Sequence, residues 1–150
     1  MRLYLEYLEF DPNREDQGYS IGGELYFSLD DRFFPGENWY DMAYFDLKTW
    51  IPALLSFGMK HTDSCFFNFM DGSYAVRMDR TEDGTIFASC LYDGVPKLRQ
   101  MKVDFRELIK SFLLCCRKYD RFLYEHGKEH CFFEEIKKLK TMARCKMNLQ

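Results

Sequence analysis

Long apolar stretches are missing from this sequence of 150 residues. The longest such run, Trp50 to Leu55, is far shorter than the roughly 18 apolar residues of a membrane-spanning helix. Charged side chains at Arg2 and Glu6 interrupt the start of the chain, which therefore does not resemble the apolar core of a signal peptide. These absences predict a cytoplasmic protein without a membrane partner.

Histidine is also scarce, with three residues, and the glycine-rich patterns GxxxxGK[ST] and GxGxxG that cradle phosphates do not occur. His126 and His130 are four residues apart, with Cys131 adjacent, a spacing that would place both imidazoles on one side of a helix. Gly127 lies between them and is predicted to end that helix, so we expect no metal site. Nothing in the sequence sets a nucleophile beside a base, so we predict no catalytic residues and no cofactor.

The overall composition is typical of a globular fold, with 47% apolar, 30% charged and 18% aromatic residues. A chain of this length buries enough surface to fold without disulfides or a metal, and we expect residues 1–150 to form a single domain. The six cysteines are predicted to be free and mostly buried, because Cys115 and Cys116 are adjacent within a helical pattern and no secretion signal is expected.

Alternating apolar residues predict strands over residues 2–10, 19–29 and 40–45, and again over 64–70, 73–80, 85–92 and 97–103. In the first strand Leu3, Leu5 and Tyr7 are predicted to face one way. Gly22-Gly23 indicates a bulge or bend in the second strand rather than a phosphate-binding loop.

The clearest structural pattern is the hairpin around Asp71-Gly72. A two-residue turn there predicts three cross-strand pairs on one mostly apolar face: Phe69 with Tyr74, Phe67 with Val76, and Cys65 with Met78. For residues 85–92 the pattern leaves two registers open, because Phe87, Ser89 and Leu91 compete with Ile86, Ala88 and Cys90 for the core face.

Three helices are expected. Asp46 is predicted to cap a short helix that ends near Phe57, with Pro52 either close to its start or kinking it. Asp104, with Glu107 three residues later, predicts the start of an amphipathic helix that ends at Gly127, and a basic helix follows over about 129–147. Strands and helices segregated in this way predict an α+β fold, an antiparallel β-sheet meander with a short central helix and two C-terminal helices packed on the sheet.

Charge is distributed unevenly along the chain. Residues 1–46 contain eleven acidic and three basic side chains, a local net charge of −8, whereas residues 101–150 have a net charge of +5. Such an asymmetry can steer a charged partner to one end, although two ordinary solvated faces would produce the same count. The overall charge of −3 argues against nucleic acid as the partner.

The most distinctive segment is the loop from Phe34 to Asp41, which combines a Pro-Gly turn, three aromatic residues and two acids. It can be read in two ways. Trp39 can anchor the loop to the core, or the loop can be an exposed recognition element, since Trp and Tyr are enriched at interface hot spots.

This segment also resembles a pattern found in small uncharacterised bacterial proteins, some of which look like immunity proteins of polymorphic toxin systems. The pattern covers residues 33–76 and consists of Phe34-Pro35, Trp39, Asp41, Leu47, Trp50, Leu54 and Asp71-Gly72-Ser73-Tyr74. The resemblance implies a binding protein that neutralises a toxin, and it supplies no catalytic residues.

The sequence therefore predicts a protein-binding module, in its most specific form an immunity-type inhibitor of a bacterial toxin, whose acidic N-terminal third meets a basic surface on another protein. The predicted contact residues are Asp30, Asp31, Glu37, Trp39 and Asp41. The alternative is a small-ligand-binding protein or enzyme with an aromatic pocket between the sheet and a helix. A homo-oligomer that uses surplus aromatic residues in a self-interface is a third hypothesis.

Overall fold

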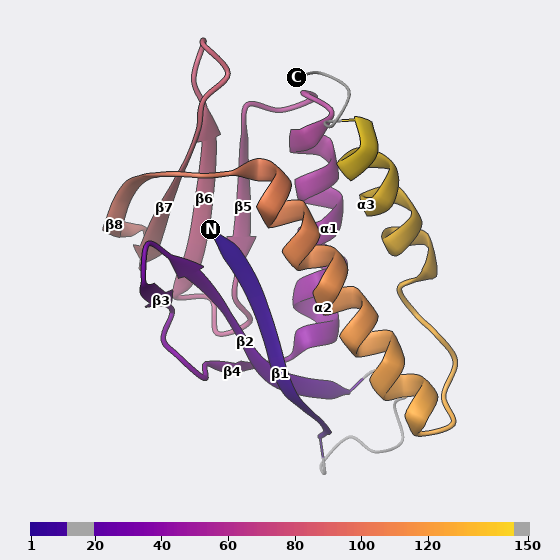
Figure 1. The fold of residues 1–150 in the computed structure, drawn as a ribbon. Coiled ribbons are helices and arrows are strands. Elements are labelled where there is room, and N and C mark those ends of the chain that lie inside the picture. Colours follow the sequence, from indigo (N-terminus) through magenta and orange to yellow (C-terminus); the bar gives the residue numbers. More distant parts are fainter. Residues whose placement is uncertain (12–19, 146–150) are drawn as a thin grey trace.

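The computed structural model describes residues 1–11 and 20–145, and Figure 1 shows their arrangement. Sheet A consists of β1 (Arg2–Phe10), β2 (Ile21–Leu29), β3 (Arg32–Phe34) and β4 (Tyr40–Asp41). Sheet B consists of β5 (Ser64–Asn68), β6 (Tyr74–Arg80), β7 (Ile86–Tyr92) and β8 (Val95–Lys102). The helices are α1 (Ala43–Gly58), α2 (Phe105–Glu125) and α3 (Phe133–Cys145). The predicted α+β class is confirmed, with the strands divided between two antiparallel sheets.

The first strand has a bulge that the alternation did not reveal. β1 pairs with β2 through Glu6↔Glu24 and next through Glu9↔Gly22, so β1 has one extra residue. Tyr7 adopts a left-handed φ of 48° there and is 80% exposed, while Leu8 packs against the core. The irregularity thus lies opposite the two glycines, on the partner strand, and the prediction that Tyr7 shares the inward face of Leu3 and Leu5 is wrong.

The outer edge of β1 is covered by α2. Ser111 Oγ accepts a hydrogen bond from Leu3 N at 2.9 Å, and Lys118 Nζ donates to Leu5 O at 3.2 Å. The Cys115 thiol also approaches Leu3 O, at 3.6 Å. Because these side chains occupy backbone groups that an added strand would need, this edge is protected against pairing with another chain.

The register between β5 and β6 matches the prediction. Cys65 pairs with Met78 and Phe67 with Val76, and Phe69 N donates to Tyr74 O. The tight turn is centred on Met70 and Asp71, one residue earlier than predicted, because Gly72 N donates to Phe69 O. In β7 the core-facing set is the one that contains Ala88 and Cys90, both fully buried.

α1 begins earlier than predicted. Its first residue is Ala43, and the residue before it, Met42, makes no side-chain capping bond. Asp46 is therefore not the cap. Its side chain is 2% exposed inside the first turn of the helix. Pro52 lies within α1, which ends at Gly58 as predicted.

The two C-terminal helices follow their patterns. Asp104 caps α2 by accepting a hydrogen bond from Glu107 N at 3.1 Å, and the predicted apolar face of α2 is buried. α3 begins at Phe133, later than predicted, because the buried carboxylate of Asp120 accepts hydrogen bonds from Cys131 N and Phe132 N and holds them outside the helix. The predicted end of α3, near residue 147, lies outside the described residues.

The core lies where both sheets meet the helices. Phe27 of β2 stacks on Trp50 of α1 and on Phe67 of β5, each with ring centroids 5.5 Å apart. Phe112 of α2 packs against Phe67 at 5.4 Å. These large rings fill the space between the sheets and the helices, so the sheets present their opposite faces outward.

Candidate interaction surface

The outer face of sheet A is built by the residues that alternate with the buried ones. Tyr4 lies opposite Tyr26 and Glu6 opposite Glu24 in the β1–β2 pairing, while Tyr40 of β4 lies opposite Glu24. On this side of the sheet, and in the loop beside it, eight residues form what we call the acidic face: Tyr4, Glu6, Glu9, Glu24, Tyr26, Phe33, Glu37 and Tyr40.

Aromatic rings form a continuous row across this face. Tyr4 stacks on Tyr26 with centroids 5.4 Å apart, and Phe33 meets the edge of Tyr26 at 5.6 Å. Phe33 is 41% exposed and Tyr40 is 48% exposed, so two aromatic rings of this face reach water, while Tyr26 beneath Phe33 is 8% exposed. A rigid aromatic surface with exposed ends is typical of interface anchors.

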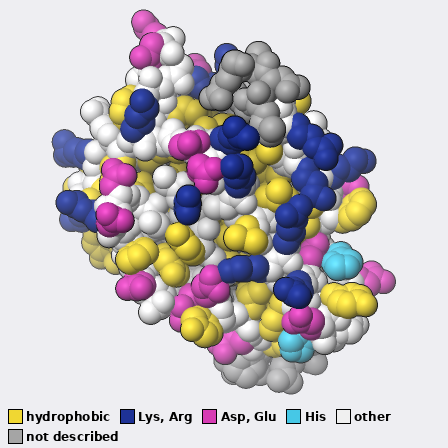
Figure 2. Space-filling model, viewed as in Figure 1, with side chains coloured by type: hydrophobic (Ala, Val, Ile, Leu, Met, Phe, Trp, Pro, Cys, Tyr) yellow, Lys and Arg dark blue, Asp and Glu magenta, His cyan; other side chains and the backbone are white. Residues whose placement is uncertain are grey.

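Carboxylates surround these rings. Burial raises the pKa of Tyr26, and the negative charges of Glu37, Glu6 and Glu24 raise it further. Burial likewise raises the pKa of Tyr40, followed by the charge of Glu9, which is also hydrogen-bonded to it. In the space-filling view, acidic side chains lie among hydrophobic ones over β1–β4, while Lys and Arg gather along α3 (Figure 2).

Few cations balance this face. Lys118 Nζ is 2.6 Å from Glu6 Oε1. Within the described residues Glu24 and Glu37 make no ion pair, and Glu24 Oε2 is buried without a hydrogen-bond partner. Glu6 and Glu24 are directly opposed across the two strands, an arrangement of like charges that lowers the stability of a sheet.

The structure places the five predicted contact residues in three different environments. Asp30 and Asp31 are exposed at the tip of the β2–β3 hairpin, with φ values of 43° and 62°, and Glu37 is exposed in the next loop. Trp39 is half-buried, with its ring edge-on to Tyr74 at 4.9 Å, and its carbonyl accepts Leu25 N. This position fits the loop-anchoring interpretation of Trp39.

Asp41 is used inside the protein. It is 7% exposed, and its two oxygens accept hydrogen bonds from Met42 N at 2.7 Å and Met70 N at 3.1 Å. Its carboxylate thereby ties the loop before α1 to the β5–β6 turn.

A second buried carboxyl, that of Asp46, lies beside Asp41. Burial, followed by the charge of the neighbouring Asp41 and a side-chain hydrogen bond with it, raises the pKa of Asp46 to about 9. Asp46 Oδ2 is buried with no partner in the described part of the chain. The Asp46 carboxyl is therefore protonated and uncharged at neutral pH.

The sequence analysis missed Tyr4, Glu6, Glu24, Tyr26 and Tyr40 as a group. The alternation that buries Leu3 and Leu5 also assigns Tyr4 and Glu6 to the opposite face, so the part of this surface that β1 contributes could be predicted. What was missing was the β1–β2 register, which brings residues about 20 positions apart side by side.

The other candidate sites considered from the sequence, a metal site and the histidine pair, have less support in the structure. Among the described residues no group of three or more His, Cys, Asp or Glu is arranged to hold a metal. His126 Nδ1 contacts Phe122 O, and His130 lies 3.7 Å from Asp120, so the two imidazoles have separate partners. The six cysteines are free, and four of them are buried, as predicted. No helix in the described ranges is long and apolar enough to cross a membrane.

A groove of about 940 Å³ lies between α1 and α3. It has no aromatic residue in its lining and lies away from the filled space between the sheets and the helices, so it differs from the aromatic pocket that the sequence suggested as an alternative.

No family model, curated protein or solved structure with which we compared the chain matches it. The resemblance of residues 33–76 to immunity proteins therefore stays a prediction, and function has to be argued from the surfaces themselves.

Proposed function

We propose that this chain is a protein-binding module that captures a partner with a basic surface through its acidic face. The observation that carries the proposal is the convergence of Glu6, Glu24 and Glu37 on Tyr26, where Lys118 is the one cation paired with them among residues 1–11 and 20–145. Carboxylates around exposed aromatic rings offer a partner both charge and apolar contact area.

The opposed pair Glu6 and Glu24 supports a binding role for energetic reasons. Like charges directly across two strands are destabilising, and an arginine or lysine from a partner would relieve that repulsion. Each such cation would then stabilise the complex more than a cation that pairs with an isolated carboxylate on a surface.

In its most specific form the partner is a toxin and this chain is its immunity-type inhibitor, as the resemblance of residues 33–76 implies. An acidic inhibitor suits a basic enzyme surface because opposite charges accelerate encounter at low salt. The hairpin tip with Asp30 and Asp31 would extend the negative field beyond the sheet.

The test begins with retention of a partner from a lysate of the source organism at low and at high salt, identified by mass spectrometry. Two variants carry the same change in net charge. Glu9→Lys/Glu37→Lys reverses two exposed charges on the acidic face, and Asp63→Lys/Glu82→Lys reverses two exposed charges beside sheet B. We expect a basic protein to be retained by the wild type and by the sheet B variant, and lost by the acidic-face variant.

Association rates with the identified partner make the comparison quantitative. The acidic-face variant should associate at least about tenfold more slowly at low salt, and the difference should shrink as salt rises. Asp30→Asn/Asp31→Asn tests the hairpin tip, since Asn keeps the left-handed turn that both residues adopt. Equal losses in both charge-reversal variants would show that net charge, and not this face, governs binding.

A further inference from the structure

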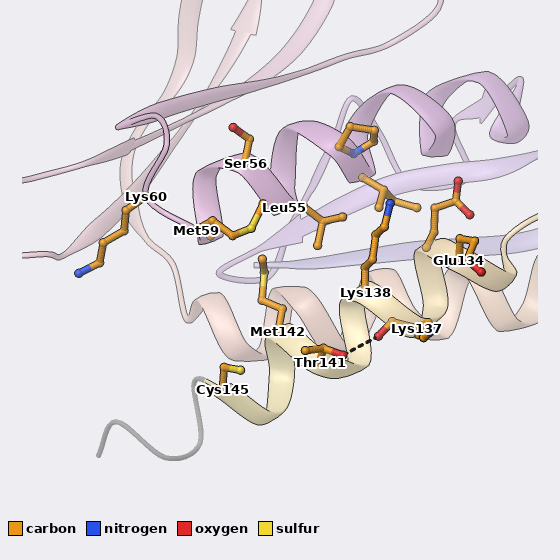
Figure 3. A pocket seen from close by; sticks show the side chains of 14 residues that line it. Leu55, Ser56, Met59, Lys60, Glu134, Lys137, Lys138, Thr141, Met142 and Cys145 are labelled. Carbon is orange, nitrogen blue, oxygen red and sulfur yellow. Dashed lines mark hydrogen bonds between the residues drawn. The ribbon is translucent and has the colours of Figure 1, made fainter.

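A groove of about 940 Å³ lies between α1 and α3. The two helices are joined at two places. Lys48 Nζ is 2.5 Å from Glu135 Oε1, and Gly58 lies so close to Met142 that a Cβ on the glycine would be 2.5 Å from the methionine sulfur. Between and beyond these contacts the helices leave the groove open (Figure 3).

The α1 side of the groove is an apolar stripe. Pro52, Leu55 and Met59 follow one another at intervals of three and four residues, so they lie along one side of the helix. Pro52 is exposed, Leu55 is half-buried, and Met59 is 55% exposed. A helix side that faces water normally carries polar residues, so this stripe is suited to contact with an apolar surface.

The rim of the groove is positively charged. Lys60 follows α1, and Lys137 and Lys138 lie on α3, where Figure 3 shows Lys138 extending toward α1. None of the three forms an ion pair within residues 1–11 and 20–145. Two glutamates, Glu134 and Glu135, also line the groove, and Glu135 already forms an ion pair with Lys48. The unpaired charge at the rim of the groove is therefore mostly positive.

The shape of the groove indicates what kind of molecule it fits. The lining of α3 runs from Glu134 to Cys145, about 16 Å at the helical rise of 1.5 Å per residue, which is the length of about three helical turns. The groove is open along its length, whereas small-molecule sites enclose most of their ligand. An occupant with one apolar side and one polar side suits such an opening better than a small ligand does.

We propose that the groove binds an amphipathic helix of a partner protein, about three turns long, with acidic residues flanking its apolar side. Its apolar residues would cover Pro52, Leu55 and Met59, and its carboxylates would pair with Lys137 and Lys138. This is the helix-in-groove mode of recognition, with methionines that adapt to the packed side chains. The site has the opposite charge to the acidic face and is independent of the function proposed above.

The test uses two synthetic 12-residue helical peptides that share leucines on one side and differ in carrying either Glu or Lys elsewhere. Protein labelled with ¹³C at the methionine methyl groups reports binding by NMR. The acidic peptide should shift the signals of Met59 and Met142 in a saturable manner and leave those of Met70 and Met78, which lie in sheet B and its turn, unchanged. The basic peptide should bind at least tenfold more weakly.

Two variants and a control assign the effect to the groove. Leu55→Glu should weaken binding of the acidic peptide at least tenfold, whereas Leu114→Glu, a change at a 54% exposed leucine on α2, should not. Lys137→Glu/Lys138→Glu should reverse the preference, so that the basic peptide binds more tightly. Circular dichroism of each variant checks that the fold is retained.

Several outcomes would overturn the proposal. Absence of methyl shifts with the acidic peptide, equal binding of both peptides, or an unchanged preference in the double lysine variant would each do so. Shifts produced by submicellar dodecanoate but not by the peptide would point to a small anionic amphiphile instead. Methyl shifts that depend on protein concentration alone would point to a second copy of the chain.

Discussion

The carboxyl pair Asp41 and Asp46 leads to a test of how this protein responds to pH. Burial and the adjacent Asp41 raise the pKa of Asp46 from its ordinary value of 3.8 to about 9. Between these two values the folded protein keeps a proton that the unfolded chain releases. The contribution of the pair to stability is therefore present at low pH and is lost as pH rises toward 9.

Replacing Asp46 with Asn should remove this dependence, since an amide resembles the protonated carboxyl and can donate to Asp41. One proton held only by the folded state lowers the free energy of unfolding by about 1.4 kcal/mol per pH unit. From pH 6 to pH 8 the Asp46→Asn variant should therefore gain about 2.7 kcal/mol relative to the wild type, as an upper limit.

Urea unfolding at pH 6, 7 and 8, in a reducing buffer and above the isoelectric point of about 5.6, measures this difference. Asp83→Asn is the matched control. Hydrogen bonds from Thr81 and Thr85 lower the pKa of Asp83, so its titration is complete below this range. A stability difference between wild type and Asp46→Asn that stays constant from pH 6 to pH 8 would refute the reasoning that the folded protein keeps this proton.

Three further changes test the fold. Asp104→Ala removes the cap of α2 and should lower the free energy of unfolding by about 1 kcal/mol in urea titrations. Asp120→Ala leaves the amides of Cys131 and Phe132 without their acceptor and should lower the free energy of unfolding by about 3 kcal/mol. Asp120→Asn should lower it less, and equal losses in the two variants would contradict this assignment. In native protein a thiol reagent should modify the exposed Cys145 rapidly and the four buried cysteines only on unfolding, which mass spectrometry of the adducts would check.

Local patterns were enough to predict several elements. The Asp-Gly turn at residues 71–72 determined the β5–β6 register, because a short turn leaves few ways to pair the strands that flank it. Asp104 marked the start of α2 because its side chain bonds an amide three residues away. Both interactions join residues that are close in the chain.

Where the predictions were wrong, the packing of the element had overridden its local pattern. Asp46 has the composition of a helix cap, yet the helix starts before it and its carboxyl contacts Asp41 inside the protein. Tyr7 was assigned to the core face by alternation, but the extra residue in β1 turns it out to solvent and brings Leu8 inward. α3 starts late because Asp120, on another helix, takes two of its preceding amides.

The sequence by itself determined the α+β class, the β5–β6 register, the amphipathic helix α2 and the acidic bias of the first third of the chain. Only the tertiary structure decided that Glu6, Glu24 and Glu37 share one face, that Asp41 is buried, and that α1 and α3 enclose a groove. The reason is physical. Periodicity and turn chemistry act over a few residues, whereas a surface or a buried charge pair forms only when strand register and helix packing bring distant residues together.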